Sequence, residues 1–160
     1  MIEAAEFRNA LGRFATGIAI VTTMDNNGMP MGLTVNSFNS VSLDPPLVLW
    51  SLDKGSNQME AFCNSGFYGV SILAHDQQLA SNLFAAMADD RFEQVDWSIA
   101  QTGAPLIDGA LARIDCTTEQ VIEGGDHVIL LGRVVDIAVS QGDPLVYYGG
   151  GYRALAQPLA

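Results

Sequence analysis

The alternation of apolar and polar positions predicts a mainly β protein. Residues 17–24 and 29–38 are rich in apolar and β-branched side chains and flank the turn-forming sequence Asp25-Asn26-Asn27-Gly28. This arrangement is typical of a β-hairpin. Further runs of the same kind predict strands at 47–52, 67–73, 110–122, 127–139 and 145–148.

Three segments have helical periodicity. Residues 3–15 place Phe7, Leu11 and Phe14 at i, i+4 and i+7, which is an apolar stripe on one helix face. Residues 56–63 predict a short second helix with Ser56 as its N-cap.

The third predicted helix covers residues 76–87 and has Asp76 as its candidate N-cap. We expect Leu79, Leu83 and Phe84 to face the core from this helix.

The segment 127–139 is apolar on both faces. One face has Ile129, Leu131, Val135 and Ile137, and the other has Val128, Leu130, Val134 and Ala138. A strand of this kind is covered on both sides. We therefore expect a closed antiparallel β-barrel whose outer side is covered by a second subunit, because the helices are few and short. A layered α/β fold would need helices that alternate regularly with strands, and the pattern does not show them.

Length and charge narrow the class of protein. The chain has 160 residues, with 18 Asp and Glu against 7 Lys and Arg, for a net charge of -11. The length fits a single domain over 1–160, with a core of about residues 6–155. The acidity argues against nucleic acid and anionic membranes as partners.

The first residues lack a basic segment followed by an apolar stretch, so no secretory signal is expected. No apolar run approaches the roughly 18 residues that a membrane span needs. Cys63 and Cys116 are far apart and lack metal-type spacing, which favours free thiols. Together these features predict a cytoplasmic protein.

The single lysine of the chain begins the polar sequence Lys54-Gly55-Ser56-Asn57. Glycine lets the backbone approach a ligand closely, Ser and Asn supply hydrogen-bond donors, and Lys adds a positive charge. The sequence is therefore a candidate anion-binding loop, although an ordinary solvated turn would have the same composition.

Several familiar motifs are absent from the sequence. There is no G-x-G-x-x-G, and Lys54 lacks the upstream glycine of a P-loop. Two histidines and two separated cysteines make a metal site unexpected. Asp126 and His127 are neighbours in sequence, and we expect them to point to opposite sides of an extended strand, which disfavours a hydrolase triad.

Seven segments, in order, resemble the flavin reductase family of two-component monooxygenases. They cover roughly residues 6–155 and are residues 7–17 (FRNALGRFATG), 32–38 (GLTVNSF), 40–48 (SVSLDPPLV), 90–92 (DRF), 109–112 (GALA), 125–127 (GDH) and 144–148 (PLVYY). The resemblance implies an FMN-binding split β-barrel with Greek-key-like antiparallel strands, usually a homodimer. It also implies hydride transfer from NAD(P)H to FMN or FAD, and delivery of the reduced flavin to a separate monooxygenase.

By this resemblance, the flavin contacts come from four segments: Thr34, Val35, Asn36, Ser37 and Phe38; Ser51, Leu52 and Asp53; Lys54, Ser56 and Asn57; and Arg91 with Phe92. Small polar side chains after a strand can reach the ring heteroatoms, and the lysine loop suits the flavin phosphate at a helix N-terminus. Arg91 could equally form a surface ion pair with Asp89 or Asp90.

The resemblance places His127 as the catalytic-site residue beside the nicotinamide, and we expect Tyr152 to close the same site from the carboxyl-terminal side. Hydride transfer between two cofactors needs no nucleophile, so we expect His127 to position rather than to react. A purely structural role for His127 would be to anchor the turn after Gly125.

Three other functions stay open at this point. A pyridoxamine-phosphate-oxidase-like enzyme is disfavoured because the chain has few basic residues. The same scarcity of basic residues favours NADH over NADPH as the hydride donor. The chain could also be a flavin-binding carrier without catalytic activity, or a β-barrel without a ligand. The sequence does not separate FMN from FAD, or a bound from a diffusible flavin.

Overall fold

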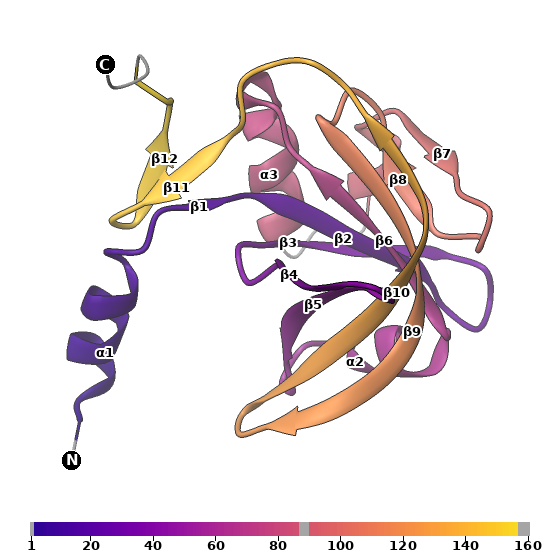
Figure 1. The fold of residues 1–160 in the computed structure, drawn as a ribbon, viewed down its shortest axis with the longest axis horizontal. Coiled ribbons are helices and arrows are strands. Elements are labelled where there is room, and N and C mark those ends of the chain that lie inside the picture. The colour runs from indigo at the N-terminus through magenta and orange to yellow at the C-terminus, as the bar shows by residue number, and fades with distance from the viewer. Residues whose placement is uncertain (1, 87–89, 157–160) are drawn as a thin grey trace.

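The computed structural model describes residues 2–86 and 90–156 and is mainly β, as predicted (Figure 1). The helices are α1 (Ala4–Leu11), α2 (Met59–Asn64) and α3 (Gln78–Ala85), with short 3-10 turns at His75–Gln77 and Arg91–Glu93. The strands are β1 (Thr16–Gly17), β2 (Ala19–Met24), β3 (Pro30–Val35), β4 (Asn39–Leu43), β5 (Pro46–Asp53), β6 (Phe67–Ile72), β7 (Trp97–Ile99), β8 (Pro105–Ile107), β9 (Ala112–Gly124), β10 (His127–Val139), β11 (Val146–Tyr148) and β12 (Gly151–Arg153).

One curved antiparallel sheet forms the body of the molecule. Its strand order is β3-β2-β6-β9-β10-β5-β4, so the predicted hairpin of β2 and β3 is confirmed and lies at one edge. The long hairpin of β9 and β10 bends across the body (Figure 1). The small β1-β11-β12 sheet lies beside it and carries the end of the described chain.

The closed barrel that we expected is not observed, because no strand ladder joins β3 to β4 within the described residues. Ser37 instead lies opposite Ser51, where the β4–β5 ladder would continue beyond the Asn39–Leu49 pair. Its Oγ accepts a hydrogen bond from the Ser51 N–H at 3.0 Å and lies 3.3 Å from the Ser51 carbonyl oxygen. A side chain thus takes the place of backbone pairing between the 36–38 segment and β5.

The concave side of the sheet encloses an aromatic core. The Trp50 ring packs edge-on against Phe62 at 4.9 Å and against Tyr68 at 6.0 Å. Phe62 comes from α2 and is fully buried, so this short helix covers one end of the core. A second apolar cluster forms under α3 around Phe84 and Ile20.

Both N-cap predictions were wrong. Helix α2 begins at Met59 with Gln58 as its N-cap, because Ser56 instead forms a turn in which its Oγ accepts from the Gln58 N–H at 3.2 Å. Helix α3 begins at Gln78 with Gln77 as its N-cap, because a 3-10 turn precedes it.

The inward face of α3 also differs from the prediction. Ser81 and Phe84 are buried, whereas Leu79 is 83% exposed. Leu83 and Phe84 contact the apolar cluster as predicted, but the other inward positions are Ala80 and Ser81, and Leu79 points to solvent. Residue 87, the predicted end of this helix, is outside the described residues.

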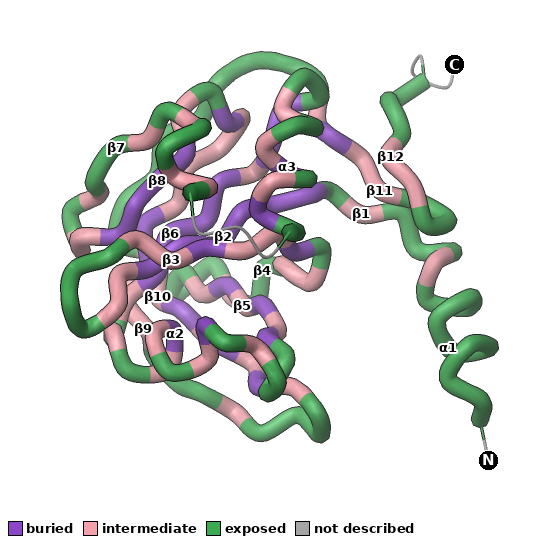
Figure 2. The backbone as a smooth tube through the Cα atoms, turned by 180° about the vertical axis from the view of Figure 1, so that it is seen from behind, coloured by how far each residue is buried: buried purple, intermediate pink, exposed green. Residues whose placement is uncertain are grey.

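Strand β10 is covered on both faces only along its first half. Val128 and Leu130 are in the core, but Val135, Ile137 and Val139 are 44%, 62% and 75% exposed. Helix α1 is also uncovered, stands apart from the sheet in both views and has no buried residue (Figure 2).

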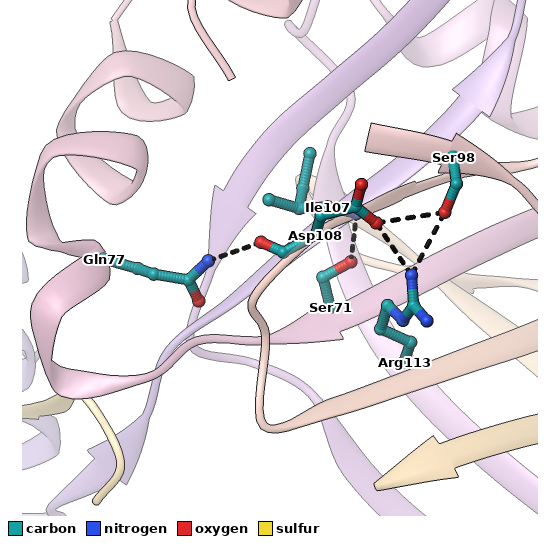
Figure 3. Close-up of polar contacts among 6 residues, drawn as sticks. All are labelled: Ser71, Gln77, Ser98, Ile107, Asp108 and Arg113. Carbon is teal, nitrogen blue, oxygen red and sulfur yellow. Dashed lines mark hydrogen bonds and ion pairs between the residues drawn. The ribbon is translucent and has the colours of Figure 1, made fainter. Parts of the chain in front are cut away.

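Four short strands were missed by the sequence analysis: β4, β7, β8 and β12. Polar contacts attach the β7–β8 hairpin to the sheet (Figure 3). The Ile107 N–H donates to Ser71 Oγ at 2.9 Å, and Arg113 donates to Asp108 at 2.8 Å. Gln77 Nε2 also donates to the Asp108 carbonyl at 2.9 Å, which fixes the start of α3 relative to this hairpin.

No helix in the described part of the chain is long and apolar enough to cross a membrane.

Candidate functional site

The end of edge strand β3 faces helix α3 and the carboxyl-terminal hairpin. Thr34 donates its hydroxyl hydrogen to the Ser81 carbonyl at 2.6 Å. The Tyr152 hydroxyl lies 2.8 Å from Ser81 Oγ and donates to Asn82 Oδ1 at 2.9 Å. Ser81 therefore contacts both Thr34 and Tyr152, which are 118 positions apart in sequence.

Two adjoining cavities lie at this end of β3. A cavity of about 230 Å³ is lined by Ile18, Thr34, Val35, Asn36, Ala85, Tyr147 and Tyr152. A cavity of about 120 Å³ is lined by Thr16, Gly17, Ile18, Ala19, Val35, Asn36, Phe38 and Ile72. Ile18, Val35 and Asn36 line both cavities, so the two form one region.

This region is apolar, with a few polar groups. The Thr16 hydroxyl at its wall is buried and has no hydrogen-bond partner among the described residues. Apolar walls with a small number of convergent polar groups are typical of small-molecule sites. The region is therefore suited to a flat apolar ring that carries a hydrogen-bonding atom.

Not every residue that was predicted to contact a ligand is accessible. Leu52 is only 1% exposed and belongs to the aromatic core, so its side chain is not available to a ligand. Ser51 and Ser37 bond to each other across the gap between β5 and the 36–38 segment. Phe38 packs partly into the core while one side lines the smaller cavity.

A third cavity, of about 80 Å³, lies at the start of β3. Arg91 donates from Nη1 to the Gly32 carbonyl at 2.7 Å, and Gln58 donates to the same oxygen at 3.0 Å. Asn57 and Phe92 complete the cavity wall, and the buried Gln58 Oε1 has no partner in residues 2–86 and 90–156.

The Arg91 guanidinium also lies 6.0 Å from the centre of the Phe84 ring. Phe92 packs edge-on between Phe84 and Trp97. Asp89, one of the two acidic residues considered as an ion-pair partner of Arg91, is outside the described residues.

The lysine loop uses most of its donors internally. The Gly55 N–H donates to Asp53 Oδ1 at 2.7 Å, and the Ser56 N–H donates to the Asp53 carbonyl at 3.0 Å. The Lys54 ammonium forms an ion pair with Glu123. Because α2 starts at Met59, Ser56 and Asn57 lie in the turn that precedes the helix.

His127 lies next to this loop. It pairs with Asp53 across β5 and β10, and the Lys54 N–H donates to the Asp126 carbonyl at 3.0 Å. The expectation that Asp126 and His127 point apart was wrong, since His127 Nδ1 lies 2.7 Å from Asp126 Oδ1. Asp126 is in the turn rather than in the strand, so its side chain can fold back onto the ring.

This contact affects the acidity of Asp126. The hydrogen bond from His127, followed by its charge, holds the pKa of the Asp126 carboxyl below its ordinary value. The ring of His127 remains 42% exposed and open to a ligand.

The predicted residues therefore fall into three groups. Thr34, Val35 and Asn36 share a cavity with Tyr152 at the end of β3, and Phe38 lines the adjoining cavity. Asn57, Arg91 and Phe92 lie at the start of β3. Asp53, Lys54, Ser56 and His127 lie where β5 ends and β10 begins. The Ser37–Ser51 contact connects the third group to the first.

Sequence reasoning missed several residues that complete these groups: Gln58, Ser81, Asn82, Glu123 and Tyr147. In the sequence pattern, each of them has the features of a helix, loop or strand residue without a special role. The only available signal was the aromatic pair Tyr147-Tyr148 before the glycine run. The others acquire their contacts through tertiary packing.

Known proteins match the chain over nearly its full length. The flavin reductase like domain matches residues 11–156. The reductase component of flavin-dependent trigonelline monooxygenase from Acinetobacter baylyi is 46% identical over 147 residues, which are 92% of this chain and 47% of that protein. The FMN reductase (NADH) SmoA from Agrobacterium fabrum is 44% identical over 146 residues, 91% of this chain and 83% of that protein.

The fold also matches a solved structure. The NADH:FAD oxidoreductase SgcE6 from Streptomyces globisporus superposes with a TM-score of 0.93 at 34% identity, covering 99% of this chain and 98% of the other. The chain spans about half the length of two of the curated relatives that it matches. On the extent and identity of these matches, the chain belongs to the flavin reductase-like family.

Proposed function

We propose that this chain is an NAD(P)H-dependent flavin reductase that transfers hydride from NADH, or NADPH, to FMN or FAD. The observation that carries the proposal is the apolar region at the end of β3, where Thr34, Val35 and Asn36 share a cavity with Tyr152 and Phe38 lines the adjoining one. The relatives support it by their names, which include an FMN reductase (NADH) and an NADH:FAD oxidoreductase.

The residues present fit a flavin ring. Val35, Ile18 and Phe38 supply apolar surface, and the Thr16 hydroxyl, unpartnered within the described residues, can form a hydrogen bond with a ring heteroatom. The Asn36 side chain lines both cavities and adds a donor and an acceptor.

Further groups would hold the rest of the flavin. We assign Lys54, Ser56 and Asn57 to the phosphate, with Ser51 and Asp53 at the strand end and Leu52 contributing only its backbone. Arg91 and Phe92 lie at the far end of β3, where they border the flavin site.

His127 and Tyr152 are assigned to the nicotinamide side. A bound flavin supplies the electron acceptor for hydride. The protein's part would be to hold the two rings in register, with the exposed His127 ring available to contact the nicotinamide and Tyr152 fixed at the site by its bonds to α3.

The site of one chain is small. Its two adjoining cavities, of about 230 and 120 Å³, together reach only the low end of the roughly 300 to 1,000 Å³ of most small-molecule sites. We therefore propose that two copies of the chain form a homodimer, in which the open sheet is completed as a split β-barrel. The exposed apolar side chains of β10 (Val135, Ile137 and Val139), of α1 (Phe7 and Leu11) and of the segment after α1 (Phe14) are the surfaces that a second copy would cover.

Sedimentation velocity tests the dimer. A species of twice the chain mass is expected for the wild type, and Ile137→Asp should shift it toward the monomer. A wild-type monomer at micromolar concentration contradicts the dimer but leaves the catalytic proposal open to its own test.

The remaining parts of the proposal concern partners and location. Relatives named as reductase components support delivery of reduced flavin to a separate monooxygenase. Both cysteines are free, which suits a cytoplasmic location. We treat residues 1–160 as one flavin reductase domain.

The experiment that tests the activity is NADH oxidation at 340 nm under air, with no flavin, with FMN and with FAD. Oxidation that saturates with added flavin is expected and ranks the two flavins. Flavin binding without NADH oxidation would support the carrier instead, and the absence of both would contradict flavin chemistry altogether.

A further inference from the structure

The only lysine of the chain is held by a carboxylate. Lys54 Nζ forms an ion pair with Glu123 Oε2, and the two side chains are 39% and 80% exposed. Glu123 is thus paired with the ammonium group that we assign to the flavin phosphate. The sequence alone did not indicate this contact, since 68 residues separate the two positions.

The strand register explains why the two residues meet. Val128 in β10 pairs with Glu123 on one side and with Leu52 on the other. Lys54 follows β5, and its N–H is fixed to the Asp126 carbonyl at 3.0 Å. The backbone of the loop is therefore tied to the β9–β10 turn, and only the lysine side chain is free to change its partner.

Glu123 lies on the same side of the sheet as the loop and α2. Its charge helps to raise the pKa of the Cys63 thiol in α2, after the larger effect of burial. A phosphate bound near Ser56 and Asn57 would thus approach the Glu123 carboxylate as well as Lys54.

The charge at this end of the sheet is negative. Asp53, Glu123 and Asp126 are acidic, whereas Lys54 is the one permanently charged cation of this group. The Asp53 carboxylate and carbonyl also occupy the N–H groups of Gly55 and Ser56. The loop is poorly suited to hold a phosphate permanently.

We propose that Glu123 competes with the flavin phosphate for Lys54 and thereby keeps the bound flavin exchangeable. The inference rests on the proposed function, because it assigns the phosphate to Lys54. In this arrangement the lysine passes from one anion to another as flavin binds, and Glu123 recovers it as reduced flavin leaves.

The expected effect is moderate because the ion pair is exposed. Pairs of this kind have small energies, so loss of the competitor should tighten FMN binding about two- to fivefold. A phosphate carries up to about two negative charges, and this explains how it can displace a single carboxylate.

The test is a titration of the full chain with FMN and with riboflavin, monitored by the quenching of flavin fluorescence without NADH. Glu123→Gln should lower the Kd for FMN about two- to fivefold and leave the Kd for riboflavin, which has no phosphate, unchanged. Glu123→Asp retains the charge and should restore most of the wild-type FMN affinity.

Glu119→Gln is the matched control. Glu119 is on the same strand, forms an exposed ion pair with Arg133 at 2.8 Å and changes the net charge by the same amount. It should leave the FMN affinity near that of the wild type, because it does not contact Lys54.

The outcomes separate the two proposals. If the wild type binds FMN but Glu123→Gln does not tighten it more than Glu119→Gln, the competition is contradicted and the reductase proposal stands. An equal gain for riboflavin also contradicts it. A folded wild-type protein without flavin affinity overturns the proposed function, and this inference with it.

Discussion

The hydroxyl of Tyr152 lies 2.8 Å from the hydroxyl of Ser81, and this contact joins the carboxyl-terminal hairpin to α3. Ser81 is fully buried and also accepts a hydrogen bond from Thr34 through its carbonyl. The wall of the larger cavity is therefore formed by three segments that are distant in sequence and fixed around one serine.

Removal of the Tyr152 hydroxyl should loosen the wall of the larger cavity. Tyr152→Phe loses the bonds to Ser81 and Asn82, each worth about 1 kcal/mol when partly buried. We expect the KM for NADH to rise about two- to fivefold with a smaller change in kcat.

Tyr147→Phe is the control for that variant, because the Tyr147 hydroxyl has no hydrogen-bond partner in residues 2–86 and 90–156. Steady-state kinetics of the two variants should differ clearly. Equal kinetics for Tyr152→Phe and wild type would show that the bond to α3 has no role in nicotinamide binding.

Loss of the His127 ring should weaken the reaction without abolishing it. We expect His127→Ala to lower kcat/KM for NADH by about 10- to 100-fold, as is usual for a positioning residue. Asp126→Asn should have a smaller effect, since it changes the orientation of the ring but keeps it. A wild-type rate for His127→Ala would exclude the role.

Salt should help the flavin to bind. FMN and the protein are both anionic, so their long-range repulsion is screened at 0.15 M ionic strength, where the Debye length is about 8 Å. Stopped-flow measurements should show an FMN association rate that increases or stays constant between low and moderate salt. A steep decrease would mean that local attraction dominates the encounter.

The two thiols should differ in reactivity. Burial, followed by the Asp115 charge, raises the pKa of Cys116 to about 12, and only the thiolate reacts readily. At pH 8 a disulfide reagent should label Cys63 slowly and Cys116 only after unfolding. Rapid labelling of both thiols in the native wild-type protein would contradict the burial of Cys116. Rapid labelling of the single remaining thiol in native Cys63→Ser would contradict it as well.

The raised pKa of Cys116 also has a consequence for stability. The unfolded thiol loses its proton near the ordinary value of 9.0, whereas the folded one keeps it to about 12. The unfolded state therefore binds fewer protons in this range, and stability should fall as pH rises through it. Thermal melts of wild type and Cys116→Val should show a steeper alkaline decrease in the wild type.

The Tyr68 side chain packs against the backbone of Gly132 and leaves room only for glycine there. A Cβ at this position would overlap the Tyr68 hydroxyl, so Gly132→Ala should lower the free energy of unfolding by about 1–3 kcal/mol. Urea denaturation checks this. Gly17→Ala, which meets nothing within 4 Å, is the control, and Tyr68→Phe should restore part of the loss.

The elements differ in how far local sequence predicts them. The hairpin of β2 and β3 could be predicted because its turn chemistry and alternation are local properties. The start of α2 could not be predicted, because the Ser56 hydroxyl could either cap the helix or form a turn. In the structure it forms the turn, in which it accepts from the Gln58 N–H. Leu79 was misplaced because the small residues Ala80 and Ser81, rather than this leucine, face the core beside Phe84, and residue type alone does not indicate that.

By itself, the sequence determined the mainly β character, the long β9–β10 hairpin and the family, because these depend on periodicity and on ordered motifs. Tertiary structure decided which side chains meet: Ser81 with Tyr152, Lys54 with Glu123, and Ser37 with Ser51. Such contacts depend on strand register and on where each helix begins. A shift of one residue in a strand turns a side chain to the opposite face, so local patterns cannot fix these pairs.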